Sequence, residues 1–447
     1  MSQNNGKELS AIKTTDRPLG ALEQAMEILN SYSGTFNIAT VSKIKGTIPE
    51  TLLRKALDTI QKRHPRLQSR IVESANQWHF QTEGTQPVPL RILEVANEEQ
   101  LQQIVEGEVN EKIESSKGLL RCLFVKGDRP ESSSYLITTI HHAISDGISS
   151  IHLHSEILKT CQEITSTGDS AGQISPLPCP KAIEEILPKW MKGVRGKLQG
   201  IWFVLQVKVK QRLYKPETFP FEKTVPLQFR KTGIVQRKLD PGLTQNILQN
   251  CRQNTTTVQG ALCTAMLFTA ARKIRGEEDR DVRVVCRNYV DLRRYLNPPV
   301  NPEDLAIMAS SLTAFHQVKP NGYFWELAQE VRQKLKKGLD NGAMFKPIFM
   351  FRKIIESLLA TPNQSSVTVA VSNVGRVNIP RNYGELELEE ISFVPGIGAF
   401  GGIFAVAVTT FREKMTLNFM FSDPSISHKT IESLADEVVV YLKEACQ

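Results

Sequence analysis

Helix patterns and strand patterns alternate along both halves of this 447-residue chain. Residues 48–64 place apolar side chains at helical spacing behind Pro49, whereas residues 134–141 are rich in β-branched and aromatic side chains, as strands are. Alternation of this kind is typical of α/β folds, in which helices flank a sheet. Because 447 residues exceed what one hydrophobic core usually supports, we expect two lobes, each a mixed β-sheet flanked by helices.

A stretch rich in Ser, Gly and Pro without apolar periodicity predicts the boundary between the lobes. We expect an N-terminal lobe over residues 1–164, a linker over 165–182 and a C-terminal lobe over 183–447. The polar segment Met1–Asp16 lacks the apolar core of a signal peptide, and the best apolar run, Ile201–Leu205, is far shorter than the ~20 residues of a spanning helix. These features predict a cytoplasmic protein.

Residues 182–213 read as a long, basic helical stretch with one apolar face. Such a face either covers the core or lies on a membrane surface, and core cover is the more frequent arrangement. The net charge of +8 suits an acidic carrier protein, a phosphorylated cofactor or an anionic membrane, while no nucleic-acid motif is present. The apolar face comprises Ile186, Leu187, Trp190, Val194, Leu198, Trp202 and Leu205.

The strand over residues 134–140 runs directly into His141 and His142, and Asp146 and Gly147 then open a helix. A junction from strand to helix places side chains at the edge of a sheet, where α/β proteins bind ligands. An imidazole titrates near neutral pH, so His142 can accept a proton from a hydroxyl or an amine. Asp146 can cap the helix or pair with an arginine, and Gly147 permits a close approach that a Cβ would block.

A metal site is the rival chemical interpretation, because four histidines and Asp146 lie within fourteen positions. Neighbouring residues of an extended chain point to opposite faces, however, so His141 and His142 diverge. His152 and His154, two residues apart on a helix, diverge as well. No histidine pair has the one-turn spacing of a helical ligand set. We therefore predict no metal and read His152 and His154 as ordinary helix residues.

The segment His141-His142-x-x-x-Asp146-Gly147 resembles the signature of acyltransferases with the chloramphenicol-acetyltransferase-like fold. This superfamily includes condensation domains, alcohol acetyltransferases, wax ester synthases and the transferases that acylate phthiocerol lipids. Three further segments are similar to family motifs and extend the resemblance over nearly the whole chain. They are His64-Pro65-Arg66-Leu67, Asp291-Leu292-Arg293 and Ser372-Asn373-Val374-Gly375.

The resemblance implies a role for each matched residue. His142 is implied to be the base that deprotonates the acceptor, and His141 to pack inward and orient the loop. Asp146 is implied to be structural, in a salt bridge for which Arg287 and Arg293 are the candidates. The substrate-binding set that we expect is Ser372, Asn373, Arg287 and Arg293, with Asn373 or backbone N–H groups near Gly147 stabilising the oxyanion.

The resemblance also implies the reaction. A thioester donor, acyl-coenzyme A or an acyl-carrier phosphopantetheine, meets an alcohol or amine acceptor in a tunnel between two lobes, and no cofactor is tightly bound. The plant branch is disfavoured because the region that would carry its "DFGWG" segment reads Ile397–Gly402 here. A silent member that binds carrier proteins or acyl chains is the alternative function, and a metal-dependent hydrolase is the third hypothesis.

One pattern points elsewhere. Gly396-x-Gly398-x-x-Gly401 matches the dinucleotide-binding spacing, which requires a helix immediately afterwards to hold the pyrophosphate. Residues 403–411 read instead as a strand, so a hairpin connection or a narrow part of an acyl tunnel explains these glycines better.

Overall fold

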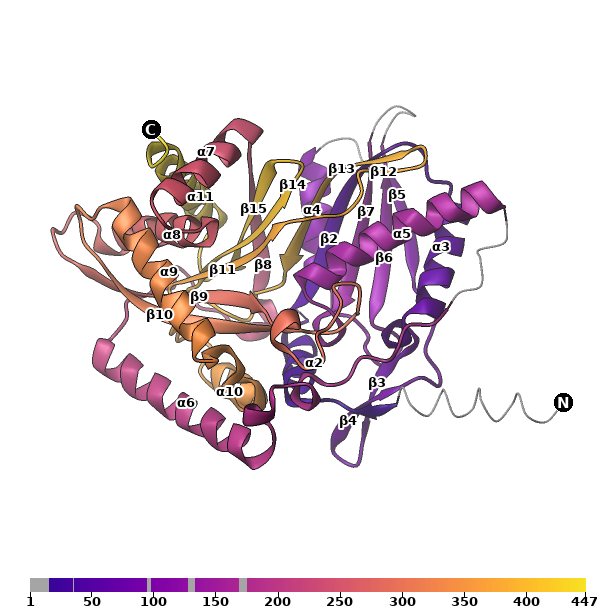
Figure 1. Cartoon of the computed structure of the whole chain (residues 1–447), viewed down its shortest axis with the longest axis horizontal. Helices are drawn as coiled ribbons and strands as arrows, with labels where there is room; N and C mark the ends of the chain where they lie inside the picture. The colour runs from indigo at the N-terminus through magenta and orange to yellow at the C-terminus, as the bar shows by residue number, and fades with distance from the viewer. Residues whose placement is uncertain (1–15, 35, 95–97, 128–132, 169–174) are drawn as a thin grey trace. The chain divides into compact units, whose positions relative to one another are not determined.

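The computed structural model describes residues 16–34, 36–94, 98–127, 133–168 and 175–447. These residues form two compact units, each containing a six-stranded sheet flanked by helices (Figure 1). The α/β class and the two mixed sheets expected from the sequence are confirmed. Unit 1 comprises Met1–Ile186, Arg293–Met308 and Asn378–Pro395, and unit 2 comprises Leu187–Leu292, Ala309–Val377 and Gly396–Gln447.

The division into units differs from the continuous lobes expected over 1–164 and 183–447. Two later segments, 293–308 and 378–395, belong to unit 1. The reason is hydrogen bonding, since β13 (Leu386–Pro395) pairs with β2 (Asn37–Lys45) of the same sheet. Helix α5 (Gly147–Thr167) runs into the expected linker, whose residues 169–174 lie outside the described part of the chain.

The large sheet of unit 1 has the strand order β12-β13-β2-β7-β6-β5. Its neighbours are antiparallel except for β5 and β6, which run parallel. A second, three-stranded sheet has the order β1-β4-β3. The strands of unit 1 are β1 Arg17–Pro18, β2 Asn37–Lys45, β3 Arg70–Ser74, β4 Gln77–Gln81, β5 Leu90–Glu94, β6 Leu120–Lys126, β7 Ser134–His141, β12 Asn382–Tyr383 and β13 Leu386–Pro395.

Helices cover both faces of the large sheet of unit 1. Thr138 of β7 contacts α5 through His154, whereas its neighbour Thr139 donates to Glu108 of α4. Because successive strand residues point to opposite faces, α4 and α5 lie on opposite sides of the sheet. The helices of unit 1 are α2 Ala21–Ser33, α3 Glu50–Arg63, α4 Glu98–Asn110 and α5 Gly147–Thr167, with 3-10 helices η1 Pro65–Gln68, η2 His142–Ile144, η3 Ile183–Glu185 and η6 Arg293–Tyr295.

The sheet of unit 2 has the order β10-β9-β11-β14-β15-β8, with parallel pairing on both sides of β11 and antiparallel pairing elsewhere. β14 directly follows the glycines of 396–402, so a strand stands where a dinucleotide site needs a helix. The strands of unit 2 are β8 Lys231–Leu239, β9 Val282–Asp291, β10 Ala309–Val318, β11 Val369–Arg376, β14 Phe404–Phe411 and β15 Lys414–Asp423.

The two faces of the unit 2 sheet are covered unequally. Val284 and Cys286 of β9 join a large core that α7, α8, α9 and α11 complete, whereas Val285 faces a small cluster with Phe315, Val367 and Tyr214. The helices of unit 2 are α6 Gly193–Tyr214, α7 Pro241–Gln253, α8 Val258–Arg275, α9 Phe324–Asp340, α10 Phe351–Ala360 and α11 His428–Glu444, with 3-10 helices η4 Lys189–Met191, η5 Leu227–Phe229, η7 Ala343–Phe345 and η8 Ile348–Met350.

The long helical stretch expected over residues 182–213 is shorter and differently packed. Of residues 182–213, only those from Gly193 onward are α-helical, in α6. The residues before it form the short 3-10 helices η3 and η4, which Pro188 separates. The expectation that its apolar face covers the core is wrong for α6, where Val194, Leu198 and Trp202 are 74%, 61% and 63% exposed, whereas Ile186 and Leu187 before it are buried. No helix in the described part of the chain is long and apolar enough to cross a bilayer.

His154 fills the space between α5 and the strands of unit 1. Its Nδ1 lies 2.8 Å from Ser42 Oγ on β2, and its Nε2 lies 2.8 Å from Thr138 Oγ1 on β7. Burial lowers the pKa of His154 to about 3, because an imidazolium in the core would lose its hydration. The expectation that His154 is an ordinary helix residue is consistent with this purely structural position.

This burial predicts acid lability. The unfolded chain binds a proton at His154 below about pH 6.5, while the folded chain stays neutral there, so stability falls as pH drops. Each pH unit below 6.5 should therefore remove about 1.4 kcal/mol through this one group. We expect His154→Gln, measured by urea unfolding between pH 7 and pH 5, to show a shallower loss of unfolding free energy by that amount per pH unit. An unchanged slope would contradict the buried neutral imidazole.

Candidate active site

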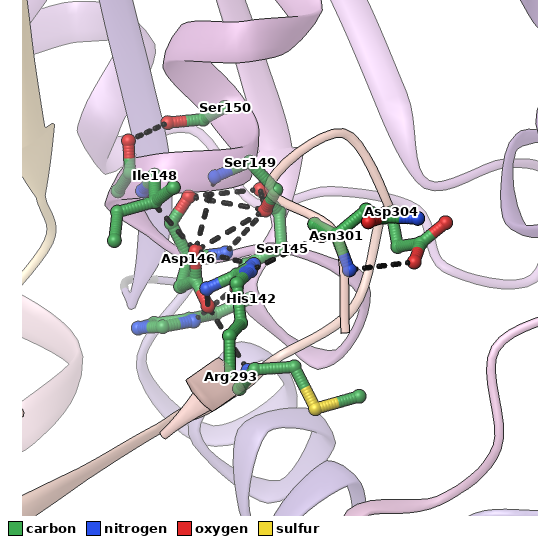
Figure 2. A network of polar contacts seen from close by, with 11 residues as sticks. His142, Ser145, Asp146, Ile148, Ser149, Ser150, Arg293, Asn301 and Asp304 are labelled. Carbon is green, nitrogen blue, oxygen red and sulfur yellow. Dashed lines mark hydrogen bonds and ion pairs between the residues drawn. The ribbon is translucent and has the colours of Figure 1, made fainter. Parts of the chain in front are cut away.

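Asp146 fixes the junction between β7 and α5 (Figure 2). β7 ends at His141, η2 turns the chain over three residues, and Asp146 is the N-cap of α5. Its Oδ1 accepts from the backbone N–H groups of Ile148 and Ser149, both at 3.1 Å, and Ser149 Oγ accepts from the backbone N–H of Asp146 at 3.1 Å. Reciprocal capping of this kind satisfies donors that a helix N-terminus otherwise leaves unpaired.

His142 has its two ring nitrogens in different environments. Nδ1 lies 2.7 Å from the carbonyl oxygen of Ser145, which can only accept, so Nδ1 carries the proton. Nε2 then holds the lone pair, and no hydrogen bond to it is seen among the described residues. The ring of Phe36 stacks on the imidazole, with centroids 5.3 Å apart and planes inclined by 20°.

The surroundings of His142 favour its neutral form. Burial lowers the pKa of the imidazole, and this effect outweighs the hydrogen bond to Ser145 and the charge of Asp146, which both raise it. The net pKa is below the ordinary value of 6.5. A neutral imidazole with an available Nε2 is the form in which a histidine accepts a proton.

A buried ion pair holds the other side of Asp146. Arg293 donates from Nη1 to Oδ2 at 2.8 Å and from Nη2 to Oδ1 at 3.1 Å, and the backbone N–H of Met308 donates to Oδ2 at 3.0 Å. Burial alone raises the pKa of Asp146, but Arg293 and the hydrogen bonds outweigh it, so the carboxyl stays ionised. Of the two candidate arginines, Arg293 therefore forms the pair, and its guanidinium is engaged there rather than offered to a substrate.

His141 points away from His142 and into unit 1. Its Nδ1 accepts from the backbone N–H of Ala143 at 3.1 Å, and its Nε2 lies 3.0 Å from Glu27 Oε2 on α2. Glu27 in turn accepts from Ser115 at 3.0 Å. Burial raises the pKa of Glu27, but the contact with His141 and the hydroxyl donors together lower it by more. The net pKa of Glu27 is therefore below its ordinary value. The pair Glu27–His141 fixes the end of β7, and sequence reasoning missed Glu27 because its partner is 114 residues away.

Gly147 is required by packing rather than by an unusual backbone angle. A Cβ at this position would lie 2.6 Å from Cε2 of Phe393 on β13, far inside van der Waals contact. The first turn of α5 therefore approaches β13 at a distance that only glycine permits.

The remaining sequence candidates lie in unit 2. Asn373 sits on β11, where its Oδ1 accepts from the backbone N–H of Gly375 at 2.8 Å, and the pairing of β11 with β14 shifts register between Asn373 and Arg376. Gly375 has φ +75°, the left-handed region that glycine tolerates. Ser372 precedes this irregularity and is half-buried. Arg287 lies on β9, with its Nε buried and lacking a hydrogen-bond partner within the described ranges.

The segment His64-Pro65-Arg66-Leu67 also has a structural explanation. His64 is buried at the end of α3, with Nε2 2.7 Å from Glu156 Oε2 on α5. Arg66 lies over the ring of Phe80 at 4.1 Å and donates to the carbonyl oxygen of Pro180 at 3.1 Å. These contacts tie α3 to α5 and to the chain that follows it. Among the described residues, no group of three or more His, Cys, Asp or Glu side chains is placed to hold a metal ion.

Two family models match successive parts of the chain. The condensation-domain model matches residues 24–176, which include the His142 and Asp146 segment. The model described as the C-terminus of phthiocerol/phthiodiolone dimycocerosyl transferase matches residues 230–420.

Similar proteins cover most of the chain at low identity. A phthiocerol/phthiodiolone dimycocerosyl transferase of Mycobacterium bovis is 22% identical over 417 residues, which span 92% of this chain and 95% of that protein. A probable alcohol acetyltransferase of Fusarium pseudograminearum is 22% identical over 68% of this chain and 66% of its own length.

Solved structures share the fold. Polyketide synthase associated protein 5 from Mycobacterium tuberculosis superposes with a TM-score of 0.70 at 17% identity, over 96% of this chain and 98% of that one. The trichothecene 15-O-acetyltransferase of Fusarium sporotrichioides gives a TM-score of 0.72 at 12% identity, over 97% and 96% of the two chains. The two family models and the names of the relatives support an acyltransferase whose residues 24–176 match the condensation-domain family, and the solved structures show that the fold is shared.

Proposed function

We propose that the protein transfers an acyl group from a thioester donor to a hydroxyl acceptor, with His142 as the general base. The observation that carries this proposal is the hydrogen bond from His142 Nδ1 to the Ser145 carbonyl, which leaves Nε2 as a lone-pair acceptor. The lowered pKa of His142 supports it, because the base must be unprotonated before the acceptor arrives.

The reaction balances without a covalent enzyme intermediate. The acceptor oxygen attacks the thioester carbonyl carbon while Nε2 of His142 takes the hydroxyl proton. The resulting oxyanion collapses, the carbon–sulfur bond breaks, and the imidazolium returns the proton to the leaving thiolate. Backbone N–H groups near Gly147 or the Asn373 amide are our candidates for the oxyanion donors, and a donor of this kind contributes about 10²–10³ in rate.

The donor in this proposal is acyl-coenzyme A or an acyl-carrier phosphopantetheine, and the product is an ester of lipid or polyketide metabolism. The names of the similar proteins support this class, since they include a dimycocerosyl transferase and acetyltransferases. Mass spectrometry of reactions that offer both donor types with a panel of alcohols and amines would identify the pair. Amide products without ester products would contradict the hydroxyl acceptor.

Substitution of the base gives the first prediction for this site. We expect His142→Ala to lower kcat by about 10²–10⁴, the usual contribution of a positioned general base. His152→Gln is the matched control, since His152 lies on the same helix outside the proposed machinery and should keep kcat within about twofold. Activity of His142→Ala comparable to that of the control, in a protein with an unchanged melting temperature, would exclude His142 as the base.

The pH dependence of the reaction gives the second prediction for this site. Acyl transfer requires neutral His142, so kcat/KM falls as pH drops through the pKa of this group. Because that pKa is lowered, the acid limb should have its midpoint below pH 6.5, and activity should persist at pH 6.5. Initial rates between pH 5 and pH 8.5, with stability checked at each pH, measure this midpoint. A midpoint above 6.5 would contradict a neutral resting imidazole.

Asp146 acts in this proposal as a positioning residue. Asp146→Asn removes a negative charge that raises the pKa of His142 and leaves Arg293 uncompensated, so the acid limb of kcat/KM should move to still lower pH. Stranding the buried Arg293 should also cost about 3–5 kcal/mol of unfolding free energy.

Two variants control the Asp146 experiment. Adding Arg293→Met removes the stranded charge and should restore part of the lost stability. Asp58→Asn breaks the partly exposed pair of Asp58 with Arg54 and should cost less than about 1 kcal/mol without moving the acid limb. Equal stability losses for Asp146→Asn and Asp58→Asn would rule out the proposed dependence on the buried pair.

A further inference from the structure

Helix α6 carries an exposed apolar stripe along its whole length. Seven large apolar side chains, two of them the adjacent Ile201 and Trp202, otherwise recur at intervals of three and four residues, so they share one face of the helix. Each is between 45% and 77% exposed. At 1.5 Å per residue, the stripe is roughly 29 Å long. Its members are Val194, Leu198, Ile201, Trp202, Leu205, Val209 and Leu213.

The opposite face of α6 explains why this stripe is turned outward. A Cβ at Gly196 would lie 1.9 Å from the carbonyl oxygen of Met191, and one at Gly200 would lie 2.9 Å from that of Lys346. These two glycines let α6 lie directly against η4 and η8 within unit 2. Tyr214, on the same inner face, packs edge-on against Phe315 at 5.1 Å. The face of α6 that carries Gly196 and Gly200 therefore packs against unit 2. This packing leaves the apolar stripe on the opposite face exposed.

The charge around the stripe has one sign. Residues 186–216 contain eight Lys or Arg and no Asp or Glu. Because the net charge of the whole chain is also +8, the other residues together carry no net charge. All eight residues are exposed, none is seen in an ion pair with another described residue, and Lys210 Nζ lies over the ring of Phe315, 4.3 Å from its centroid. An occupant that buries the stripe must therefore be apolar in its centre and anionic at its edges. The eight residues are Lys189, Lys192, Arg195, Lys197, Lys208, Lys210, Arg212 and Lys215.

We propose that the outer face of α6 binds the surface of an anionic lipid bilayer. Apolar side chains including a tryptophan, flanked by Lys and Arg, are the pattern of helices that lie in the interface, with the apolar face below the headgroups. The helix is too charged to cross the bilayer, so it lies along it. An acidic carrier protein would satisfy the cations but not seven exposed apolar side chains, which favours the bilayer. This inference does not depend on the reaction proposed above.

Vesicle flotation with the full-length protein tests the proposal. The protein should float with vesicles of phosphatidylcholine and phosphatidylglycerol, and much less with phosphatidylcholine alone. Trp202→Glu should weaken this binding by about tenfold or more, because a carboxylate replaces an inserted apolar side chain. Phe229→Glu is the matched control: Phe229 is 63% exposed, like Trp202, but lies on η5 outside the stripe, and its variant should bind normally.

The electrostatic part of the binding is tested with the double variant Lys208→Gln, Arg212→Gln. This variant should bind anionic vesicles about fivefold more weakly for each charge removed, and its binding should depend less on salt. Failure of the wild-type protein to float with anionic vesicles would overturn the proposal. So would equal binding by Trp202→Glu and Phe229→Glu. A dimer that Trp202→Glu dissociates, or an acidic carrier protein that binds through Lys208 and Arg212, would likewise overturn it if no vesicle binding accompanies either result.

Discussion

One buried carboxylate holds together two stretches of chain that are far apart in sequence, the start of α5 and the segment 293–308. Asp146 caps α5, accepts two hydrogen bonds from Arg293 and accepts a third from the backbone of Met308. An ionised group in such a place is stable only because every partner is present, since an unpaired buried charge costs several kcal/mol. The loop that presents His142 is thus fixed at one end by this carboxylate. At the other end it is fixed by the contact of His141 with Glu27.

The division of labour between the two histidines follows from their hydrogen bonds. His141 has both nitrogens engaged inside unit 1, and His142 has one engaged and one available. The stacked ring of Phe36 covers the imidazole of His142 and contributes to the burial that keeps it neutral. The two adjacent histidines therefore differ in their contacts: His141 is held by Ala143 and Glu27, whereas only Nδ1 of His142 has a hydrogen-bond partner among the described residues.

Local signals in the sequence predicted the strand and the helix that flank His142, but not the elements that support them. β7 was predicted at its observed bounds, and α5 within one residue at its start, because a strand of β-branched residues meets a capping Asp there. Helix α2 was missed, since Gly20 offers no capping side chain, and with it Glu27. β2 was missed because its buried Thr40 and Ser42 look solvent-facing until the partner His154 of Ser42 is known. For α6, periodicity identified the apolar face but not the glycine face that packs.

The chain order of unit 1 has a consequence for how the protein is made. The central strand β2 has β13 as a neighbour, so Ile38 pairs with Pro395 across more than three hundred residues. Pairings of such long separation close late, because the loop entropy must be lost before the contact forms. During synthesis the first half leaves the ribosome with one edge of β2 open, and that edge stays open until residue 395 has emerged. Unit 1 therefore cannot complete its sheet before most of unit 2 exists, and the two units mature together.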